Sequence, residues 1–237
     1  MYFVKGIRIT LLVTVLALIL GVVLGVLVAI IRSAHDQQPV KKRGIVLRIL
    51  NVICKVYLTV IRGTPMMVQL LIMWFVIWAG ARATDGNLIR CAVISFGINS
   101  GAYVAEIVRS GIMSIDKGQM EAGRALGMSY SSTMFRVVIP QAVKNVVPTM
   151  GNELITLLKD TSVAGYITVI DVTFAVQRIV SRNYMALVDY MILAVIYLII
   201  VLIVTVILKA IEKRLHKNDG GNRVVSRKKL FAKRGNK

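Results

Sequence analysis

This sequence of 237 residues has few of the side chains on which most metal and catalytic sites depend. It contains only two cysteines and two histidines. Cys54 and Cys91 lie far apart in apolar surroundings, so they match no disulfide framework and no metal-binding spacing. We expect them to be ordinary buried thiols. His35 and His216 lie in polar segments, which argues against a histidine-based catalytic site or a proton relay inside a membrane.

Two common enzyme motifs are also missing. There is no G-x-x-x-x-G-K-[ST] phosphate loop, so the chain has no visible means of binding ATP by that route. There is no H-E-x-x-H pair either. We therefore predict that the chain is not an enzyme, and we assign no catalytic residue, no metal ligand and no cofactor of its own.

Acidic residues are scarce as well, with 11 against 30 lysines and arginines. In a soluble protein a net charge of +19 would suggest nucleic acid as the partner. Here 57% of the residues are hydrophobic, above the 45–50% of a typical soluble domain. The stretches 9–31 and 190–208 contain no charged residue. Both meet the length of about 20 apolar residues that a membrane helix needs, so we predict an integral membrane protein.

Three further stretches are weaker candidates for membrane spans. Residues 63–81 are uncharged, 88–108 are mostly apolar, and about 145–167 are apolar but contain three charged residues. Together with 9–31 and 190–208 they predict an all-α, polytopic protein with about five spans. The membrane region covers 1–212, and a basic tail covers 213–237. A short helix outside the membrane is predicted at about 118–127.

The basic residues are grouped by loop, which predicts the orientation. Lysine and arginine number five in 32–48, five in 109–144 and eleven in 209–237. The alternate segments 1–8, 82–90 and 171–189 hold two each. By the positive-inside rule the C-terminus and the 118–127 helix are cytoplasmic and the N-terminus is outside.

Gly21 and Gly25 form a Gly-x-x-x-Gly pair in the first span. This spacing allows two helices to approach closely. Packing within the chain is at least as good an explanation as a contact between two copies.

The segment from Gly118 to Pro140 has features of a surface helix followed by a turn. Ala122, Ala125 and Leu126 fall along one side of a helix. Gly127 can end that helix in a left-handed conformation. Ser129 or Ser131 can then cap the next helix. An amphipathic loop helix with no partner has the same local features.

The longer pattern resembles the signature of ABC importer permeases, which is Glu-Ala-Ala, three residues, Gly, nine residues, Ile, one residue, Leu-Pro. Here Glu121-Ala122-Gly123 precedes Gly127, Val137 follows, and Ile139-Pro140 ends the pattern. Glycine at 123, valine at 137 and isoleucine at 139 are conservative departures.

Three other segments strengthen the resemblance. They are similar to permeases for polar amino acids of the histidine, glutamine, arginine and cystine type. Residues 62–69 resemble the sequence that enters the second span of those permeases, and 99–106 and 151–162 also match. The likeness covers roughly residues 5–212.

The resemblance implies the membrane-spanning permease subunit of an ATP-driven amino-acid importer in a bacterial cytoplasmic membrane. It implies a second permease subunit, identical or related, a dimer of cytoplasmic ATP-binding cassette ATPases and an extracytoplasmic amino-acid-binding protein. ATP and Mg²⁺ would bind to the partner ATPase. The path would work by alternating access.

In that family the helix at Glu121 is the coupling helix, which sits in a groove of the ATPase. The resemblance implies that Glu121 is a charged anchor for the ATPase and that Gly127 forms the turn after the helix. It also implies a close fit to the ATPase through Ala122, Gly123, Ala125 and Leu126.

Ionisable residues inside predicted spans are the candidates for the substrate path. A charge near the bilayer centre costs roughly 2.5–3.5 kcal/mol, so Glu153 needs compensation. Glu153 and Asp160 are two helical turns apart and share a face. This face could form an acidic wall for a substrate amino or guanidinium group. Glu153 could instead pair with Lys159, Arg109 or backbone, and for Asp160 such a structural role is favoured.

Four uncharged residues complete the candidates for the path. Asn99 and Ser100 can donate hydrogen bonds to a carboxylate or can join neighbouring helices. Met66 and Gln69 can line the path, but a structural role for residues 62–69 as the start of a helix is favoured. In that role Thr64 caps the helix, Pro65 lies in its first turn and Arg62 lies at the cytoplasmic edge.

Two other classes of protein remain as alternatives. A secondary amino-acid transporter driven by an ion gradient would use Glu153 and Asp160 but would have no role for the Glu121–Pro140 signature. A scaffold that anchors a soluble enzyme would explain the cytoplasmic helix but not the polar residues inside the spans.

Overall fold

A computed structural model describes residues 2–38 and 44–234 of the chain, and of residue 2 and residues 215–234 it describes the backbone alone. The predicted charges at 41–43 lie outside the described residues. All regular elements in the described ranges are helical, as predicted. In chain order they are α1 (Tyr2–Gln37), α2 (Ile45–Gly63), α3 (Met66–Ile72), the π-helix η2 (Met73–Ile77), α4 (Asp85–Met113), α5 (Lys117–Ala125), α6 (Tyr130–Thr133), the π-helix η3 (Met134–Val138), α7 (Ile139–Asp160), the 3₁₀-helix η4 (Thr161–Ile167), α8 (Val172–Asn183) and α9 (Ala186–Arg234).

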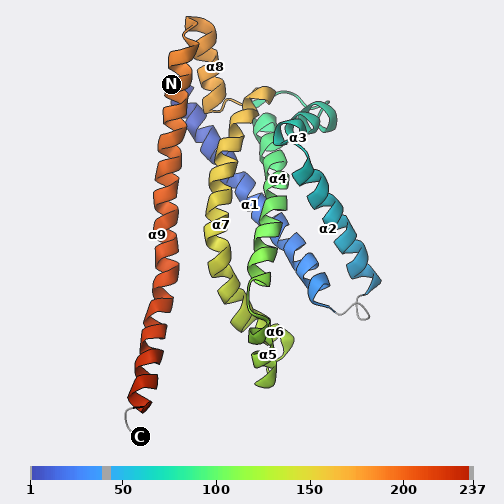
Figure 1. Cartoon of the computed structure of the whole chain (residues 1–237). Helices are drawn as coiled ribbons and strands as arrows, with labels where there is room; N and C mark the ends of the chain where they lie inside the picture. The colour runs from blue at the N-terminus through green and yellow to red at the C-terminus, as the bar shows by residue number, and fades with distance from the viewer. Residues whose placement is uncertain (1, 39–43, 235–237) are drawn as a thin grey trace.

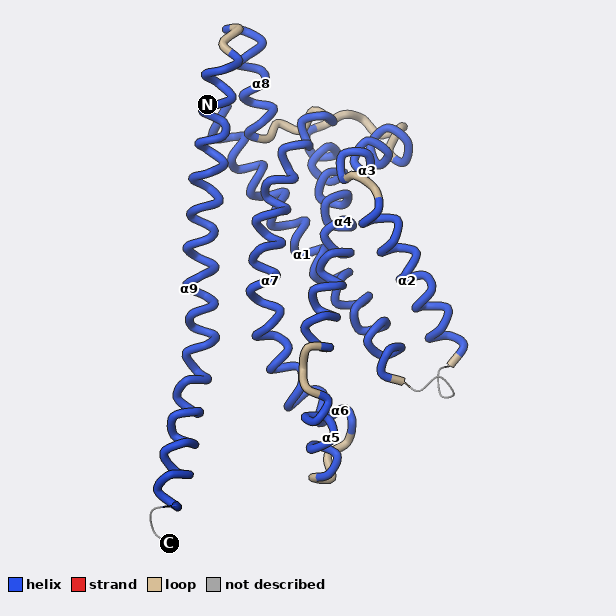
Figure 2. The backbone as a smooth tube through the Cα atoms, in the orientation of Figure 1, coloured by secondary structure: helices blue, strands red, loops and turns tan. Residues whose placement is uncertain are grey.

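The long helices run between two ends of the molecule. α1, α2, α4, α7 and α9 lie roughly lengthwise, with α3 and α8 at one end, the upper end, and α5 and α6 at the other, the lower end (Figures 1 and 2). Within the described residues, three helices are long and apolar enough to cross a membrane alone, or up to five if each of two bent helix pairs counts as one span. The predicted spans 9–31, 88–108 and 190–208 lie within α1, α4 and α9, and 145–167 coincides with most of α7 and η4.

The second predicted span, 63–81, does not match a single helix. The long helix here is α2, which ends at Gly63, and the helix formed by α3 and η2 turns away from it by 108°. Its 12 residues, 66–77, are only about 18 Å long at 1.5 Å per residue, too short for a bilayer core. The 19 residues of α2 reach about 28 Å. The sequence prediction missed α2 because Arg48, Lys55 and Arg62 interrupt its apolar run. Arg62 consequently lies at the upper end of α2, whereas α5, which we predicted on the same side of the membrane, lies at the lower end.

The bend between α2 and α3 has a local cause. Thr64 is extended, as expected for a residue that precedes proline, and Pro65 begins α3 as its N-cap residue. Thr64 does not cap α3 with its side chain as predicted, because its hydroxyl donates back to the Val60 carbonyl at 2.8 Å. The Gln69 amide nitrogen donates to the Ile61 carbonyl at 2.7 Å and to the Thr64 hydroxyl at 2.7 Å. Gln69 thereby satisfies a carbonyl that the end of α2 leaves free.

The pair Gly21 and Gly25 forms a close contact between α1 and α4. A Cβ atom at Gly21 would lie 3.0 Å from the Ser100 Cβ, and one at Gly25 would lie 2.5 Å from a Val104 methyl carbon. The Gly-x-x-x-Gly spacing therefore serves packing within the chain. The main apolar core lies beside this contact and joins α1, α3, α4 and η4, with Phe96, Leu70 and Ile167 as its largest fully buried side chains.

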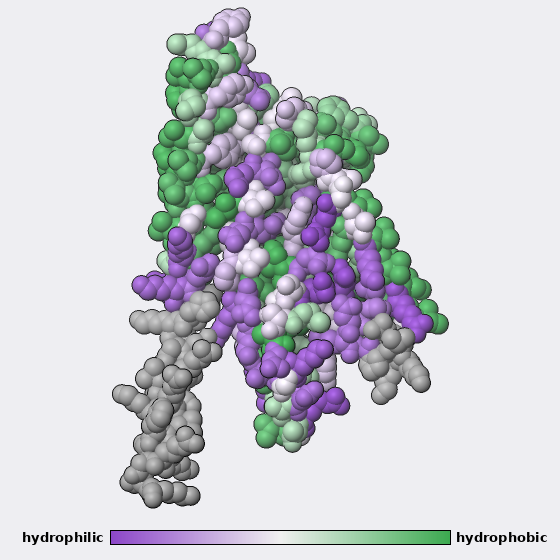
Figure 3. Space-filling view, in the orientation of Figure 1, coloured by the Kyte–Doolittle hydropathy of each residue, from purple (hydrophilic) through white to green (hydrophobic). Residues whose placement is uncertain are grey.

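The outer helices expose apolar side chains over long stretches. α1 exposes Val15, Ile19 and Val23, and none of the most apolar window of α9 is buried inside the chain. In Figure 3 the hydrophobic colour covers α9 and the outer edge of α2. These surfaces suit lipid. α9 also continues as a helix to Arg234, so the predicted tail, 213–237, begins as an extension of the last span rather than as a separate segment.

Candidate functional site

The α5–α6 segment (residues 114–133) lies at the lower end of the molecule, between α4 and α7 in the chain. α5 spans Lys117–Ala125, close to the predicted 118–127. Gly127 is left-handed, with φ of 78°. The Gly127 amide donates to the Arg124 carbonyl and the Met128 amide donates to the Gly123 carbonyl, each at 3.0 Å. This pair of bonds is a Schellman motif and confirms the predicted glycine stop. The Ser129 hydroxyl then accepts from the Ser132 amide, which caps α6 as expected.

The two sides of α5 differ. Ala122, Ala125 and Leu126 are exposed, and the Leu126 side chain is 82% accessible. Gly123 is buried, and a Cβ there would lie only 2.4 Å from a Thr133 methyl carbon. Gly123 therefore allows α5 to pack against α6, while the exposed side remains available to a partner. Glu121 is exposed and helps to line a hollow between α5 and the lower end of α1, with Asp36 and Arg124.

An ion-pair network joins the lower ends of α1 and α4 next to this hollow. Arg32 Nη1 lies 2.6 Å from Glu106 Oε1, and Arg109 Nη2 lies 3.1 Å from Glu106 Oε2. Arg109 also contacts Asp36 at 3.5 Å. Asp36 belongs both to this network and to the hollow beside Glu121. The network therefore ties α1 and α4 together just above the α5–α6 segment.

Exposed polar side chains form one continuous polar face along α2, α4 and α7. On α7 the exposed polar residues recur at intervals of three and four, which places them on one side of the helix. A hollow lined by Glu106, Ser110, Asn145 and Thr149 joins α4 to α7. We call this surface the polar face, and Figure 3 shows hydrophilic colour over the same three helices. Its exposed residues are Arg48, Lys55, Thr59 and Arg62 on α2, Tyr103 and Ser110 on α4, and Asn145, Thr149, Asn152, Thr156 and Lys159 on α7.

Glu153 lies at the flank of the polar face, between α7 and α4. Its Oε1 accepts a hydrogen bond from the Ser100 hydroxyl at 2.7 Å. Arg109, one of the partners considered for Glu153, instead pairs with Glu106 and Asp36. In the described part of the chain, neither Glu153 nor Asp160 forms an ion pair. Asp160 is the last residue of α7, two turns above Glu153, and is partly buried. The partner that the structure gives Glu153 is therefore a neutral hydroxyl and not a cation.

The other sequence candidates lie away from the polar face. Asn99 donates to the Gln69 side-chain oxygen at 3.0 Å, which fastens α4 to the α2–α3 bend. Gln69 has both ends of its amide engaged in that bend. Met66 packs against the main apolar core. The structure therefore brings Ser100 and Glu153 together and gives Asn99, Gln69 and Met66 structural contacts around the α2–α3 bend.

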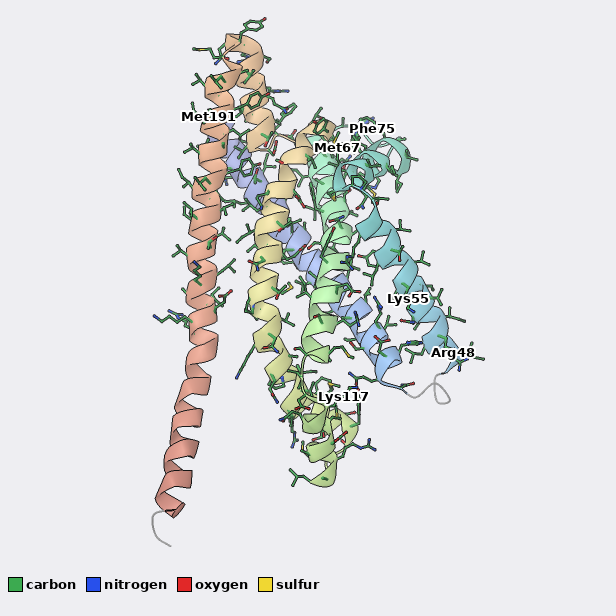
Figure 4. The ribbon with its side chains drawn as sticks, in the orientation of Figure 1. Arg48, Lys55, Met67, Phe75, Lys117 and Met191 are labelled. Carbon is green, nitrogen blue, oxygen red and sulfur yellow. The ribbon has the colours of Figure 1, made fainter. Side chains whose placement is uncertain are left out.

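Sequence reasoning missed the contribution of α2. Arg48, Lys55 and Arg62 are each seven residues apart, a spacing that puts them on one side of a helix. Figure 4 labels Arg48 and Lys55 along α2. The Arg62 guanidinium carbon lies 5.5 Å from the centre of the Tyr103 ring on α4. The seven-residue period was visible in the sequence, but the interrupted hydropathy concealed the helix that carries it.

Comparison with known proteins identifies the family. Residues 44–217 match the binding-protein-dependent transport system inner membrane component. Over 170 residues the chain is 40% identical to the L-cystine transport system permease protein TcyB of Bacillus subtilis, covering 71% of this chain and 72% of that protein. It is 36% identical over 191 residues to the arginine transport system permease protein ArtQ of the same organism, covering 74% and 85%.

The fold agrees with a solved structure. A chain from the crystal structure of an amino acid ABC transporter with histidines superposes with a TM-score of 0.78 at 36% identity, and the match covers 90% of this chain and 94% of that chain. The family match over residues 44–217 includes the α5–α6 segment.

The chain belongs to the family of inner membrane permease components of binding-protein-dependent amino-acid ABC transport systems. The ATPase of such a system is a separate subunit, and the permease carries no cofactor. A binding-protein-dependent system implies an ATPase and a binding protein as partners and places this multi-pass chain in the cytoplasmic membrane. This assignment decides against the gradient-driven transporter and the scaffold.

Proposed function

We propose that this chain pairs with an identical or related permease subunit, and that the two polar faces enclose the path of a polar amino acid. The observation that carries this proposal is the polar face itself. Charged and amide side chains occupy exposed positions on α2, α4 and α7, whereas α1 and α9 expose apolar side chains. A charged side chain in lipid costs roughly 2.5–3.5 kcal/mol, so the polar face needs water or a second subunit against it.

The lower end of the molecule is the cytoplasmic end in this proposal, with the N-terminus outside. The end of α1, the α5–α6 segment and the extension of α9 all reach that end (Figure 1). The segments 32–48, 109–144 and 209–237 carry 21 lysines and arginines in all, against six in 1–8, 82–90 and 171–189. Basic residues concentrate in cytoplasmic loops, which supports this orientation.

The α5–α6 segment then meets the ATPase. Exposed Ala122 and Ala125 allow a close approach, exposed Leu126 offers an apolar contact, and Glu121 offers a charge. The Schellman motif at Gly127 holds the end of α5 in a fixed direction relative to α6. Closure of the ATPase pair would move this segment as a rigid body, and the ion pairs between α1 and α4 would carry the movement to the polar face.

The substrate in this proposal is a polar amino acid of the kind carried by the relatives, whose names include L-cystine and arginine. Glu153, which accepts from Ser100 on one oxygen, offers its second oxygen to an ammonium or guanidinium group. Asp160 extends the acidic character toward the upper end of α7. Gln69, Met66 and Asn99 would support the α2–α3 bend at the mouth of the path rather than touch the substrate.

Reconstituted transport tests the proposal directly. Liposomes would hold the chain with its co-purifying ATPase, with ATP inside and candidate binding proteins outside. Uptake of labelled L-arginine, L-histidine, L-glutamine and L-cystine would be measured, and each component would be omitted in turn. We expect accumulation of at least one amino acid, which stops when ATP, ATPase or binding protein is left out.

Two results would contradict the proposal. One is accumulation that follows an ion gradient and persists without ATP. The other is failure to accumulate any of the four amino acids although the loaded binding protein stimulates the ATPase, because the path would then carry something else.

A further inference from the structure

α2 carries a line of positive charge through the membrane. Arg48, Lys55 and Arg62 are exposed and lie seven residues apart, so each is about two turns beyond the last on the same side of the helix. Lys55 lies near the middle of the 19 residues of α2. A lysine at that depth is too costly to face lipid, because its head group cannot reach the membrane surface without strain on the side chain. Lys55 must therefore face water or protein.

The contacts of α2 show which way this line faces. The Arg62 guanidinium lies over the ring of Tyr103, the exposed aromatic residue of α4 on the polar face. The opposite side of α2 exposes Ile49, Ile53 and Val60, which suit lipid. Because Lys55 shares the side of Arg62, it belongs to the polar face (Figures 3 and 4).

The depth of Lys55 follows from its neighbour Tyr57. The Tyr57 hydroxyl donates to the Ile98 carbonyl of α4 at 2.5 Å, and a Cβ at Gly101 would lie 2.9 Å from the same hydroxyl oxygen. Tyr57 is therefore level with residues 98–101, which include Ser100, the partner of Glu153. Lys55 is only two residues from Tyr57, about 3 Å along the helix axis. Lys55 and Glu153 thus lie at similar depth on the two flanks of α4.

The charge of Lys55 has no counterpart within the described residues, where no ion pair includes it. The other intramembrane cation near the lower end, Arg32, is paired with Glu106. Glu153 likewise lacks a cationic partner. Within the described residues the polar face therefore has Lys55 without an ion-pair partner on its α2 flank, and Glu153 and Lys159 without one on its α7 flank. An amino acid that lies along α4 could present groups of opposite charge to Lys55 and Glu153.

We propose that Lys55 receives the α-carboxylate of the amino acid in the path, while Glu153 faces its ammonium group. This inference rests on the proposed function and deepens it, because it assigns a specificity role to a side chain on α2. The lysine ammonium group donates to either oxygen of a charged carboxylate, whereas a carboxamide offers only one uncharged carbonyl oxygen, which is a weaker partner for a cation. Lys55 would therefore select substrates that carry a free carboxylate, independently of the binding protein.

Direct binding to the complex tests this role. The permease with its ATPase would be placed in nanodiscs without binding protein. Binding of L-arginine, L-histidine, L-glutamine and L-cystine, and of the α-carboxamide of each, would be measured. Lys55→Met should weaken binding of the amino acid about tenfold, since a hydrogen bond to a charged group contributes about 1.5–3 kcal/mol and 1.4 kcal/mol is a factor of ten. Binding of the carboxamide should hardly change.

Two further variants make the result specific. Lys55→Arg keeps the positive charge and should retain most of the preference for the free carboxylate. Ile53→Ala shortens an exposed side chain on the opposite side of α2, away from the polar face, and it should leave both affinities near those of the wild type. Retained ATPase activity and an unchanged elution volume would show that each variant is assembled.

The outcomes separate this inference from the function on which it rests. Suppose that the wild-type complex binds an amino acid and that Lys55→Met still prefers this amino acid to its carboxamide as strongly as the wild type does. This result would overturn the role of Lys55 but not the proposed function. Equal weakening of amino acid and carboxamide by Lys55→Met also overturns it, because the lysine would then act on structure. A wild-type complex that binds none of the four amino acids overturns both proposals together.

Discussion

The α5–α6 segment and the polar face differ in how their structure is determined. The first is built from contacts close in sequence, namely the Schellman turn at Gly127, the cap at Ser129 and the packing of Gly123 on Thr133. The second joins residues that are distant in sequence, such as Arg62 with Tyr103, 41 positions apart, and Ser100 with Glu153, 53 positions apart. In the proposed function, one region would transmit movement and need a fixed shape, while the other would meet the substrate and need unpaired polar groups. Variants in the two regions should therefore fail in different ways.

The largest effect is expected where the shape of the α5–α6 segment depends on one residue. Gly127→Ala forces a side chain into a left-handed conformation, at a cost of about 1–2 kcal/mol, and redirects the end of α5. Amino-acid uptake should fall at least tenfold in proteoliposomes, and Glu121→Ala should act in the same direction by removing the charged anchor. Gly86→Ala is the control, because a Cβ there meets no atom within 4 Å. Unchanged uptake and ATPase stimulation in both test variants would contradict the coupling role.

A smaller effect is expected on the polar face. Glu153→Gln keeps the size of the side chain and its acceptor for Ser100 but removes the charge. Initial uptake should fall about tenfold, with the loss mainly in apparent affinity, because one charged hydrogen bond to the substrate is lost. Asp85→Asn is the control, an exposed acid at the upper end that pairs with Lys5. If Glu153→Gln transports like the wild type, Glu153 has only a structural role.

The smallest effect is expected where the two regions meet. Glu106→Ala leaves Arg32 and Arg109 without their shared partner and should lower the stability of the protein by about 1–3 kcal/mol. Thermal unfolding of the detergent-solubilised subunit measures this loss. Asp36→Ala should cost less, because its contact with Arg109 is longer, at 3.5 Å. An equal or larger loss for Asp36→Ala would show that Glu106 is not the centre of the network.

The sequence allowed good predictions where neighbours along the chain decide the structure. α5 lies within two residues of the predicted 118–127, and Gly127 is left-handed as predicted. Of the two predicted caps, Ser129 and Ser131, the structure uses Ser129. The wrong second span shows the limit. The hydropathy of a stretch is an average over all sides of a helix. In α2 the basic residues on one side lower the average that the apolar residues on the other side raise, so the uncharged stretch 63–81 was predicted instead.

The polar face could be predicted only in part. Glu153 was recognisable because a carboxylate inside a span always needs an explanation. Its partner could not be predicted, because the pairing depends on how α4 packs between α1 and α7. In the structure Glu153 accepts from Ser100, while Arg109 pairs with Glu106 and Asp36. Asn99 and Gln69 were equally polar candidates, yet tertiary packing uses them to fasten the α2–α3 bend.

The central claim is that the α5–α6 segment couples ATP hydrolysis to transport and that the polar face lines the path of the amino acid. The ratio of ATP hydrolysed to amino acid imported tests this claim most directly. This ratio would be measured in the same proteoliposomes for the wild type, Gly127→Ala and Glu153→Gln at saturating binding protein. We predict that the ratio rises several-fold in Gly127→Ala, because hydrolysis continues without movement of the path. In Glu153→Gln both rates should fall together and leave the ratio near that of the wild type. Equal ratios in the two variants, or a raised ratio only in Glu153→Gln, would contradict the account.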